Sequence, residues 1–245
     1  MNGNGNLRRA RGVLFDLGGT LLRELNFDRR AGRARVLEIA NNPKKATLAD
    51  YGAVADEFQT TVYANREDAL LEFSVLAFGR LVYERLGLTF DIPPEDVELE
   101  FWNAAVRMEP QPGVGEMLET LHSAGILLGV VSNSVFSGYT LSKEIEKHGL
   151  LERFQFVISS ADYSIRKPHR AIFLAAAAKL GLDPDEIWFA GDTLRQDIVG
   201  AMDAGMTAVW YNPGGASAGA YTPDVEIRHW DEFPERLGVP TRVEG

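Results

Sequence analysis

Hydrophobic and polar residues alternate with two different periodicities along this chain, and the change of periodicity divides the chain into regions of different predicted structure. Val13–Phe15 is an unbroken apolar run, which is typical of a strand buried on both faces. Between about residues 27 and 108, apolar positions recur at helical spacing, with breaks at NNPKK and FDIPPED. These patterns predict one short strand followed by a series of helices over 27–40, 48–88 and 93–108.

Beyond this helical stretch, short apolar runs and amphipathic segments alternate as far as residue 230. The pattern predicts helices over 113–123, 138–148, 169–180 and 195–204, and strands over 126–133, 154–160, 187–192, 207–212 and 225–230. Alternation of this kind is typical of a parallel sheet with helices on both faces. We therefore predict an α/β fold with a doubly wound, parallel-sheet, Rossmann-like core formed by residues 1–23 and 109–245. A helical domain at 24–108 interrupts this core after its first strand.

Composition and charge exclude several classes of protein. The 245 residues carry a formal net charge of −10, so no basic field is present to gather the phosphates of a nucleic acid. The absence of cysteine excludes disulfides, thiolate metal sites and cysteine nucleophiles. No apolar stretch approaches the length of a membrane span, and MNGNGNLRRARG lacks the apolar segment of a signal peptide. We expect a cytoplasmic protein with no nucleic-acid or membrane partner, and the sequence carries no indication of its oligomeric state.

Polar side chains follow the carboxyl ends of four predicted strands, which form the edge at which ligands bind in open α/β sheets. In chain order these residues are Asp16, Ser132 with Asn133, Lys167 shortly after the third strand, and Asp192 with Asp197 one turn later. A single acid at one strand end would be weak evidence for a ligand-binding site. Acids, a hydroxyl, an amide and a lysine at four strand ends are predicted to converge on one edge of the sheet.

The motifs FDLGGTL, VVSNS, RKP and FAGDTLRQD stand at these four strand ends, in this order. Together they resemble the motifs of the haloacid dehalogenase-like hydrolase superfamily, in the subgroup with a helical cap inserted after the first strand. They extend from Asp16 to Asp197, and the cap lies between the first and second motifs. The resemblance implies a hydrolase with a Rossmann-like core and a helical cap domain that selects the substrate.

For the first acid and its partners, the resemblance implies a nucleophile and a metal site. Asp16 would attack, and Mg²⁺ would be held by Asp16, the backbone carbonyl of Gly18 and Asp192. The chemistry independently requires such groups, because a phosphate dianion repels a carboxylate until a cation bridges the two. Mg²⁺ takes a few oxygen ligands and keeps waters, which suits two carboxylates and one carbonyl.

For the remaining residues, the resemblance implies a phosphate-binding site. Ser132, backbone amides around Asn133, and Lys167 would bind the phosphoryl oxygens, and Asp197 would support Lys167 or the waters of the metal. A lysine supplies a point charge on those oxygens. Attack by Asp16 would give an aspartyl phosphate, which divides one difficult hydrolysis into two easier steps. We therefore predict a Mg²⁺-dependent phosphohydrolase that acts on a small organic phosphate.

Position 18 departs from the family pattern, because most phosphatases of this superfamily carry a second Asp two residues after the nucleophile. That Asp protonates the leaving alkoxide and then activates water, whereas Gly18 keeps the carbonyl but offers no proton. Glu24 or Asp28, just past the first motif, could replace it. If neither residue replaces it, three explanations are open: the substrate has a good leaving group, the reaction has changed, or catalysis has largely been lost.

Among changed reactions, dehalogenation is disfavoured, because the dehalogenases lack the metal-binding acid that Asp192 supplies in an intact GDTLRQD. Phosphonoacetaldehyde hydrolases keep Mg²⁺, carry a small residue at the position of Gly18 and form a Schiff base through a cap lysine. The only lysines between residues 24 and 108 are Lys44 and Lys45, whose position also fits two solvated residues in a loop between helices. A phosphonate hydrolase and a binding or scaffold protein with weakened catalysis stay open as alternatives.

Overall fold

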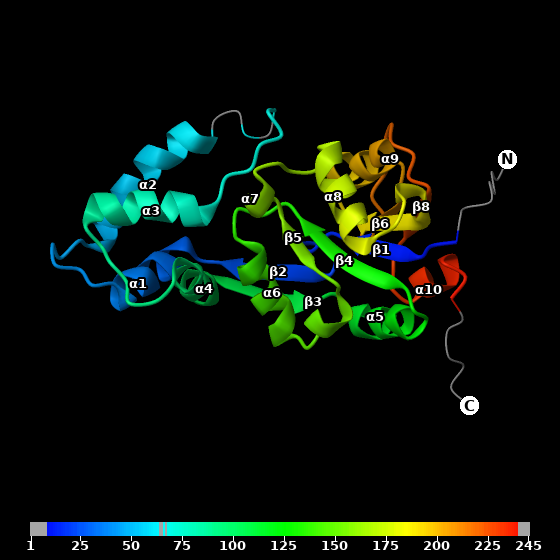
Figure 1. Cartoon of the computed structure of the whole chain (residues 1–245), viewed down its shortest axis with the longest axis horizontal. Helices are drawn as coiled ribbons and strands as arrows, with labels where there is room; N and C mark the ends of the chain where they lie inside the picture. Colours follow the sequence, from blue (N-terminus) through cyan, green and yellow to red (C-terminus); the bar gives the residue numbers. More distant parts are fainter. Residues whose placement is uncertain (1–8, 64–65, 67, 240–245) are drawn as a thin grey trace.

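The computed structural model describes residues 9–63, 66 and 68–239, and its centre is one parallel sheet (Figure 1). The six strands lie in the order β5–β4–β1–β6–β7–β8, and every neighbouring pair is parallel. The first strand therefore lies in the middle of the sheet, with β4 on one side and β6 on the other. The strands are β1 (Gly12–Phe15), β4 (Leu127–Ser132), β5 (Val157–Ser159), β6 (Ile187–Gly191), β7 (Thr207–Tyr211) and β8 (Val225–Ile227).

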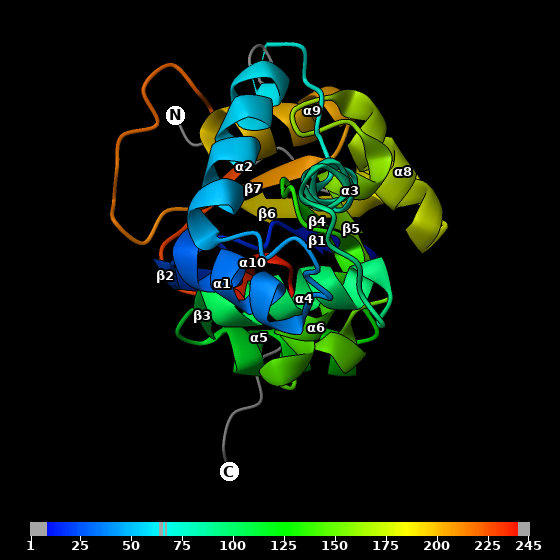
Figure 2. The same cartoon turned by 90° about the vertical axis from the view of Figure 1, so that its left-hand side faces the viewer.

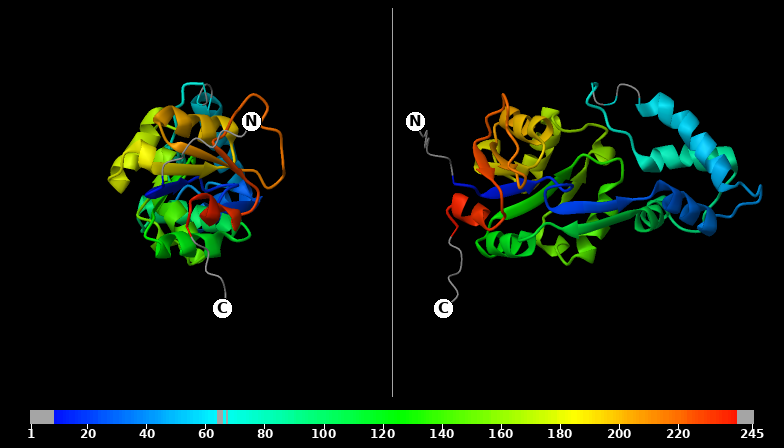
Figure 3. Two further views of the ribbon diagram at one scale, coloured as in Figure 1. Left: turned by 90° about the vertical axis from the view of Figure 1, so that its right-hand side faces the viewer. Right: turned by 180° about the vertical axis from the view of Figure 1, so that it is seen from behind.

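Helices cover both faces of this sheet, as Figure 1 and the left view of Figure 3 show. Because side chains alternate along a strand, Phe15 packs in one apolar cluster and Leu14 in another. The predicted doubly wound α/β core is confirmed, and no helix in the described part of the chain is long and apolar enough to cross a membrane. The first cluster includes α5 (Val114–Ser123), α6 (Gly138–Lys147) and α10 (Glu232–Arg236), and the second includes α8 (Arg170–Leu180) and α9 (Gly200–Ala204). Short helical turns lie between these elements at η1 (Leu151–Arg153), α7 (Ser160–Tyr163) and η2 (Pro184–Glu186).

Between β1 and β4 the chain leaves the carboxyl edge of the sheet through an antiparallel ribbon that the sequence pattern did not indicate. In this ribbon β2 (Leu22–Phe27) pairs with β3 (Val106–Pro110), and both strands connect to four helices (Figures 1 and 2). Beyond Leu22 all of β2 is exposed, so it lacks the apolar alternation that marks a half-buried strand. Residues 106–108, predicted as the end of a helix, belong to β3 instead.

The helical stretch predicted over 48–88 is wrong in its middle, because a non-helical segment separates two of the four helices of this insertion. Residues 70–74, which we call the strap, are not helical, and Ser74 caps the helix that follows. The backbone of the strap bonds to the core, since Leu70 O accepts from Arg166 N and Glu72 N donates to Ser164 O, each at 3.1 Å. These bonds replace those that a helix would make within the segment. The helices are α1 (Arg29–Ile39), α2 (Leu48–Tyr63), α3 (Val75–Leu86) and α4 (Pro94–Ala105).

The last helix of the insertion, α4, lies against α6 of the core, and buried polar groups join the two. Trp102 donates its Nε1–H to Glu144 Oε2 at 2.7 Å. Glu98 Oε2 accepts from Thr140 Oγ1 at 2.7 Å and from the backbone N–H of Ser137 at 3.0 Å. By sequence α4 belongs to the insertion, whereas these contacts tie it to the core. The domain boundaries at residues 24 and 108 therefore stay a prediction.

Two predicted elements near the C-terminus differ from those observed. The helix predicted over 195–204 begins as a π-helical turn, η3 (Leu194–Val199), before α9 continues it. The strand predicted over 225–230 ends at Ile227, and the chain leads into α10. Trp230 is buried there and stacks on Tyr211 with ring centroids 4.6 Å apart. It fills the core beside Phe15 instead of extending the sheet.

Candidate active site

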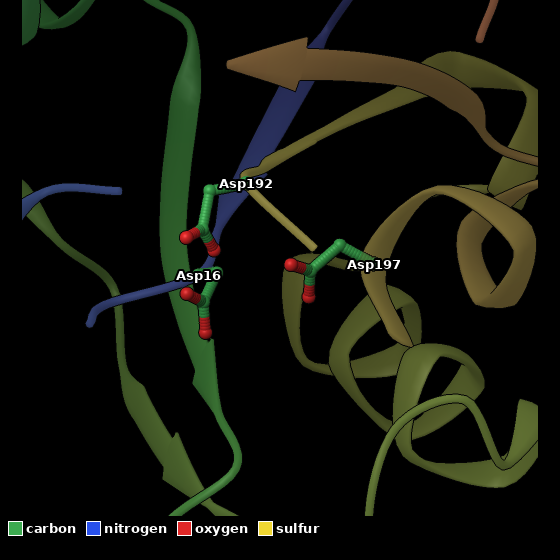
Figure 4. Close-up of side chains that lie close together, drawn as sticks. All are labelled: Asp16, Asp192 and Asp197. Carbon is green, nitrogen blue, oxygen red and sulfur yellow. The ribbon is translucent and has the colours of Figure 1, made fainter. Parts of the chain in front are cut away.

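Acidic side chains meet at the carboxyl edge of the sheet, where β1 and β6 end side by side (Figure 4). The strand register places Phe15 opposite Ala190, so Asp16 and Asp192 leave adjacent strands close to the same level. Asp197 approaches them from η3 (Figure 4). One carboxylate oxygen from each of the three acids lies within 4.8 Å of the others. The structure thus brings together the three acids that the sequence predicts to converge at this edge.

The ammonium group of Lys167 lies between two of these acids. Its Nζ is 2.6 Å from Asp16 Oδ1 and 2.7 Å from Asp197 Oδ1, and the side chain is 1% exposed. Burial alone would lower the pKa of this ammonium, but the carboxylates of Asp16 and Asp197 outweigh it and raise the pKa above its usual value. Lys167 is therefore a fixed positive charge beside the Asp16 carboxylate.

Asp197 is engaged with Lys167 and with its own loop. Its Oδ1 accepts from Lys167 Nζ, and its Oδ2 accepts from the backbone N–H of Thr193 at 2.9 Å. Burial raises the pKa of the Asp197 carboxyl, and the Lys167 ammonium acts in the opposite direction. Gly191 makes room for this side chain, because a Cβ at Gly191 would lie 2.5 Å from the Asp197 Cβ. Of the two roles considered for Asp197, support of Lys167 fits these contacts.

The side chain of Asn133 has a use that the sequence did not indicate. Its Oδ1 accepts from Lys167 N at 2.8 Å, and its Nδ2 donates to Lys167 O at 2.9 Å and to Gln196 Oε1 at 3.0 Å. The amide therefore holds the backbone that carries the ammonium. The predicted phosphate contacts would come from Ser132, which is buried at the end of β4, and from backbone N–H groups around Asn133, although that of Ser134 already donates to Ser160 Oγ at 2.9 Å.

The turn after Asp16 contains one glycine that the geometry requires and one that it does not. Gly19 has a φ of +81°, and a Cβ there would lie 2.4 Å from Asp192 Oδ2. Gly18 is outside the left-handed region, and no described atom lies within 4 Å of the place where its Cβ would be. The position at which most phosphatases of the family carry an acid is therefore open space.

Two further side chains that the sequence analysis did not single out hold this turn in place. Thr20 Oγ1 donates to Asp16 Oδ2 at 3.3 Å, and Gln111 Nε2 donates to Gly19 O at 2.9 Å. Thr20 stands inside FDLGGTL, so the motif itself could have found it. Gln111 comes from the far side of the insertion, and no local pattern connects it to the turn.

The charge balance of the cluster fits a bound cation. Three carboxylates face one ammonium, and burial together with the charge of Asp16 raises the pKa of the Asp192 carboxyl. A divalent cation between Asp16 and Asp192 would remove this repulsion, and carboxylate oxygens are the ligands that Mg²⁺ prefers. Asp197 is a less suitable ligand, because it is the most buried of the three acids, at 1% exposed, and its oxygens accept from Lys167 Nζ and from the backbone N–H of Thr193.

The other residues considered from the sequence have different surroundings. Asp28 is the N-cap of α1, where its carboxylate accepts two backbone N–H bonds, and Glu24 is exposed in β2. Lys44 and Lys45 are exposed in the connection between α1 and α2. Figures 1 and 3 place this connection at the end of the insertion that is remote from the six-stranded sheet. The structure does not bring these lysines to the acids.

Comparison with known proteins finds relatives that match this chain over almost its whole length. Curated relatives include the phosphoglycolate phosphatase of Salmonella paratyphi A, which is 29% identical over 254 residues, covering 96% of this chain and 95% of the relative. The phosphoglycolate phosphatase of Yersinia pseudotuberculosis is 29% identical over 247 residues, covering 96% of each chain.

Among solved structures, the chain is similar to a 2-haloacid dehalogenase from Pseudomonas syringae pv. Tomato, with a TM-score of 0.66 and 24% identity over 94% of this chain and 98% of that one. At this identity the similarity supports a shared fold alone. The family model described as haloacid dehalogenase-like hydrolase matches residues 10–205, which include every motif at the acidic edge. The chain belongs to the haloacid dehalogenase-like hydrolases.

Proposed function

We propose that this hydrolase is a Mg²⁺-dependent phosphatase in which Asp16 accepts the phosphoryl group of a small organic phosphate. The observation that carries the proposal is the setting of Asp16, whose carboxylate lies 2.6 Å from a buried ammonium and beside a second acid, Asp192. A carboxylate next to one fixed cation, with ligands for another, suits attack on a phosphate dianion. The phosphoglycolate phosphatases among the relatives support a phosphate ester as the substrate.

Residues of this chain supply the nucleophile and the groups that bind the phosphoryl oxygens. One carboxylate oxygen of Asp16 attacks phosphorus, the bond from phosphorus to the leaving oxygen breaks, and that oxygen departs with the electron pair. Lys167, Ser132 and the backbone amides around Asn133 bind the phosphoryl oxygens while charge develops on them. Water then cleaves the aspartyl phosphate, which restores the Asp16 carboxylate and releases inorganic phosphate.

The proposed ligands of Mg²⁺ are the side chains of Asp16 and Asp192 and the backbone carbonyl of Gly18. When bound, the ion supplies the positive charge that allows a carboxylate and a phosphate to approach each other. Asp197 keeps Lys167 protonated and in place. The helices within residues 24–108 act as the cap, which encloses the substrate and excludes water during the transfer.

The alternatives have less support. Phosphonate hydrolysis through a Schiff base requires a lysine at the reacting carbon, and Lys44 and Lys45 lie at the remote end of the insertion (Figures 1 and 3). A scaffold has no need of a buried ammonium paired with an acid at the ligand-binding edge of the sheet. We therefore keep the phosphatase as the one proposed activity.

Asp16→Asn is expected to lower turnover by at least about 10³-fold, because an amide is a poor nucleophile toward phosphorus. The measurement is the release of inorganic phosphate from a panel of phosphorylated metabolites that includes phosphoglycolate, with and without Mg²⁺. A 2-haloacid and phosphonoacetaldehyde serve as chemical controls. Metal-free turnover of the haloacid, or appreciable phosphatase activity of pure Asp16→Asn protein, would refute the proposal.

Gly19→Ala is expected to weaken Mg²⁺ binding strongly, because the new methyl group would collide with the Asp192 carboxylate. Gly18→Ala is the matched control and should bind Mg²⁺ like the wild type, since no described atom lies near the added carbon. Asp192→Ala should bind Mg²⁺ least of all. Titration calorimetry with Mg²⁺ measures all three variants without reliance on turnover, and equal affinities throughout would place the metal site elsewhere.

The wild-type protein is expected to prefer substrates with weakly basic leaving groups, because position 18 offers no proton. A positioned general acid typically contributes about 10²–10⁴-fold, and alkyl phosphates such as phosphoglycolate would lack this help. Gly18→Asp should raise kcat/KM for an alkyl phosphate more than for an aryl phosphate. The substitution suits the backbone, since Gly18 is outside the left-handed region and no described atom lies within 4 Å of a Cβ there.

The measurement for this prediction is kcat/KM for one aryl and one alkyl phosphate in both proteins. Gly18→Ala controls for the added carbon, and a Mg²⁺ titration of Gly18→Asp controls for displacement of the metal. Equal wild-type rates for the two phosphates would mean that another acid protonates the leaving oxygen. Glu24 and Asp28 would then be the first residues to replace.

A further inference from the structure

The strap of the insertion lies across the two loops that carry the proposed phosphate site. On one side, two backbone hydrogen bonds of 3.1 Å join it to segment 164–166, which immediately precedes Lys167. On the other side, Val75, the first residue of α3, donates its N–H to Val135 O at 2.8 Å in the loop after β4. The insertion is therefore fastened to the core beside both sets of phosphate-binding groups.

Glu72 is the residue of the strap whose side chain enters these loops. The side chain is 1% exposed, and its Oε2 accepts from Ser160 Oγ at 3.0 Å. The same Oγ accepts from the backbone N–H of Ser134 at 2.9 Å and lies 3.1 Å from Ser134 O. A hydroxyl has one proton, and a carboxylate is a stronger acceptor than a carbonyl. The charge of Glu72 thus favours donation of that proton to Glu72, while a lone pair of the same oxygen accepts from the Ser134 amide.

The same carboxylate also faces the residue before Lys167. Arg166 is 6% exposed, and its Nε lies 3.9 Å from Glu72 Oε2, while Arg66 Nη1 lies 3.2 Å from Glu72 Oε1. A buried guanidinium next in sequence to a buried ammonium needs negative charge nearby. Glu72 supplies negative charge from the insertion, so the docked strap contributes to the electrostatic balance around Arg166.

We propose that Glu72 is a positioning residue that holds the Ser134 loop and the Arg166–Lys167 segment in the register that binds a phosphoryl group. This inference rests on the proposed phosphatase function. The phosphate site of the core is then complete only when the strap is docked. Enclosure of the substrate by the insertion and placement of the phosphate-binding groups become one event.

Two substitutions interrupt the contacts that run from Glu72 through Ser160 to Ser134, each at a different residue. Glu72→Gln keeps the size and an acceptor oxygen but removes the charge, and Ser160→Ala removes the hydroxyl between Glu72 and Ser134. Each is expected to lower kcat/KM about 10–100-fold, as misplacement of positioned groups does. Each should also weaken binding of inorganic phosphate in the presence of Mg²⁺ while Mg²⁺ affinity stays unchanged. Because both interrupt the contact from Glu72 to Ser134, the double variant should lose less than the sum of the two free-energy changes.

Glu98→Gln is the matched control for general loosening of the insertion. Glu98 is also a buried glutamate of the insertion that accepts hydrogen bonds from the core, but its partners are Thr140 on α6 and Ser137, the N-cap of that helix. Glu98→Gln and Glu72→Gln should both lower thermal stability, but Glu98→Gln should leave kcat/KM nearly unchanged. An equal loss of kcat/KM in Glu98→Gln would overturn the inference, because docking in general would then be responsible.

Amide hydrogen exchange tests the positioning role without turnover. Exchange over residues 132–136 should be faster in Glu72→Gln and Ser160→Ala than in the wild type. Exchange over residues 165–168 should be faster in Glu72→Gln, and both segments should be unchanged in Glu98→Gln. Unaltered exchange there in Glu72→Gln, or additive kinetic losses in the double variant, would also overturn the inference. A wild-type protein that hydrolyses no phosphate would overturn the proposed function instead, and exchange would still decide whether Glu72 orders the two loops.

Discussion

A buried ammonium group is the constraint on which the rest of this structure depends. Lys167 is almost completely enclosed, and its charge is tolerated only because Asp16 and Asp197 face it at 2.6 Å and 2.7 Å. Breaking such a buried pair costs about 3–5 kcal/mol, a large share of the stability of an ordinary domain. Neighbouring residues serve this contact, since Asn133 binds the Lys167 backbone through both its N–H and its carbonyl, and Gly191 leaves space for Asp197.

The ammonium neutralises only part of the negative charge at this edge, and the remaining imbalance has a structural origin. Adjacent parallel strands in register deliver Asp16 and Asp192 to the same place, where burial and mutual repulsion raise the pKa of Asp192. A fold could avoid this repulsion by separating the acids. Here Gly19 does the opposite, because the missing Cβ lets the turn after Asp16 pass directly beside Asp192. Acids kept this close fit a site built around a cation that comes from solution.

The predictable parts of this protein are those that depend on short stretches of sequence. The core strands and most core helices follow from local apolar patterns, and Asp16, Asp192 and Lys167 follow from strand ends and motifs. The ribbon of β2 and β3 and the strap could not be predicted in this way, because their hydrogen bonds join residues far apart in the chain. The same is true of Asn133, which stands in a recognisable motif but whose partner, the Lys167 backbone, lies 34 positions away.

The backbone requires glycine at position 19 but not at position 18, so the glycine at position 18 has no structural cause. Its neighbour Gly19 must be glycine, since φ is positive and the Asp192 carboxylate occupies the place of a Cβ, but no described atom restricts position 18. The missing second acid is therefore not a consequence of the fold, and Asp28, one of the two candidates to replace it, already caps α1. On the proposed mechanism the leaving oxygen must depart as an anion or take a proton from solvent or from the substrate itself. Substrate choice is then divided between two parts of the molecule: the insertion selects by shape, and position 18 selects by the basicity of the leaving group.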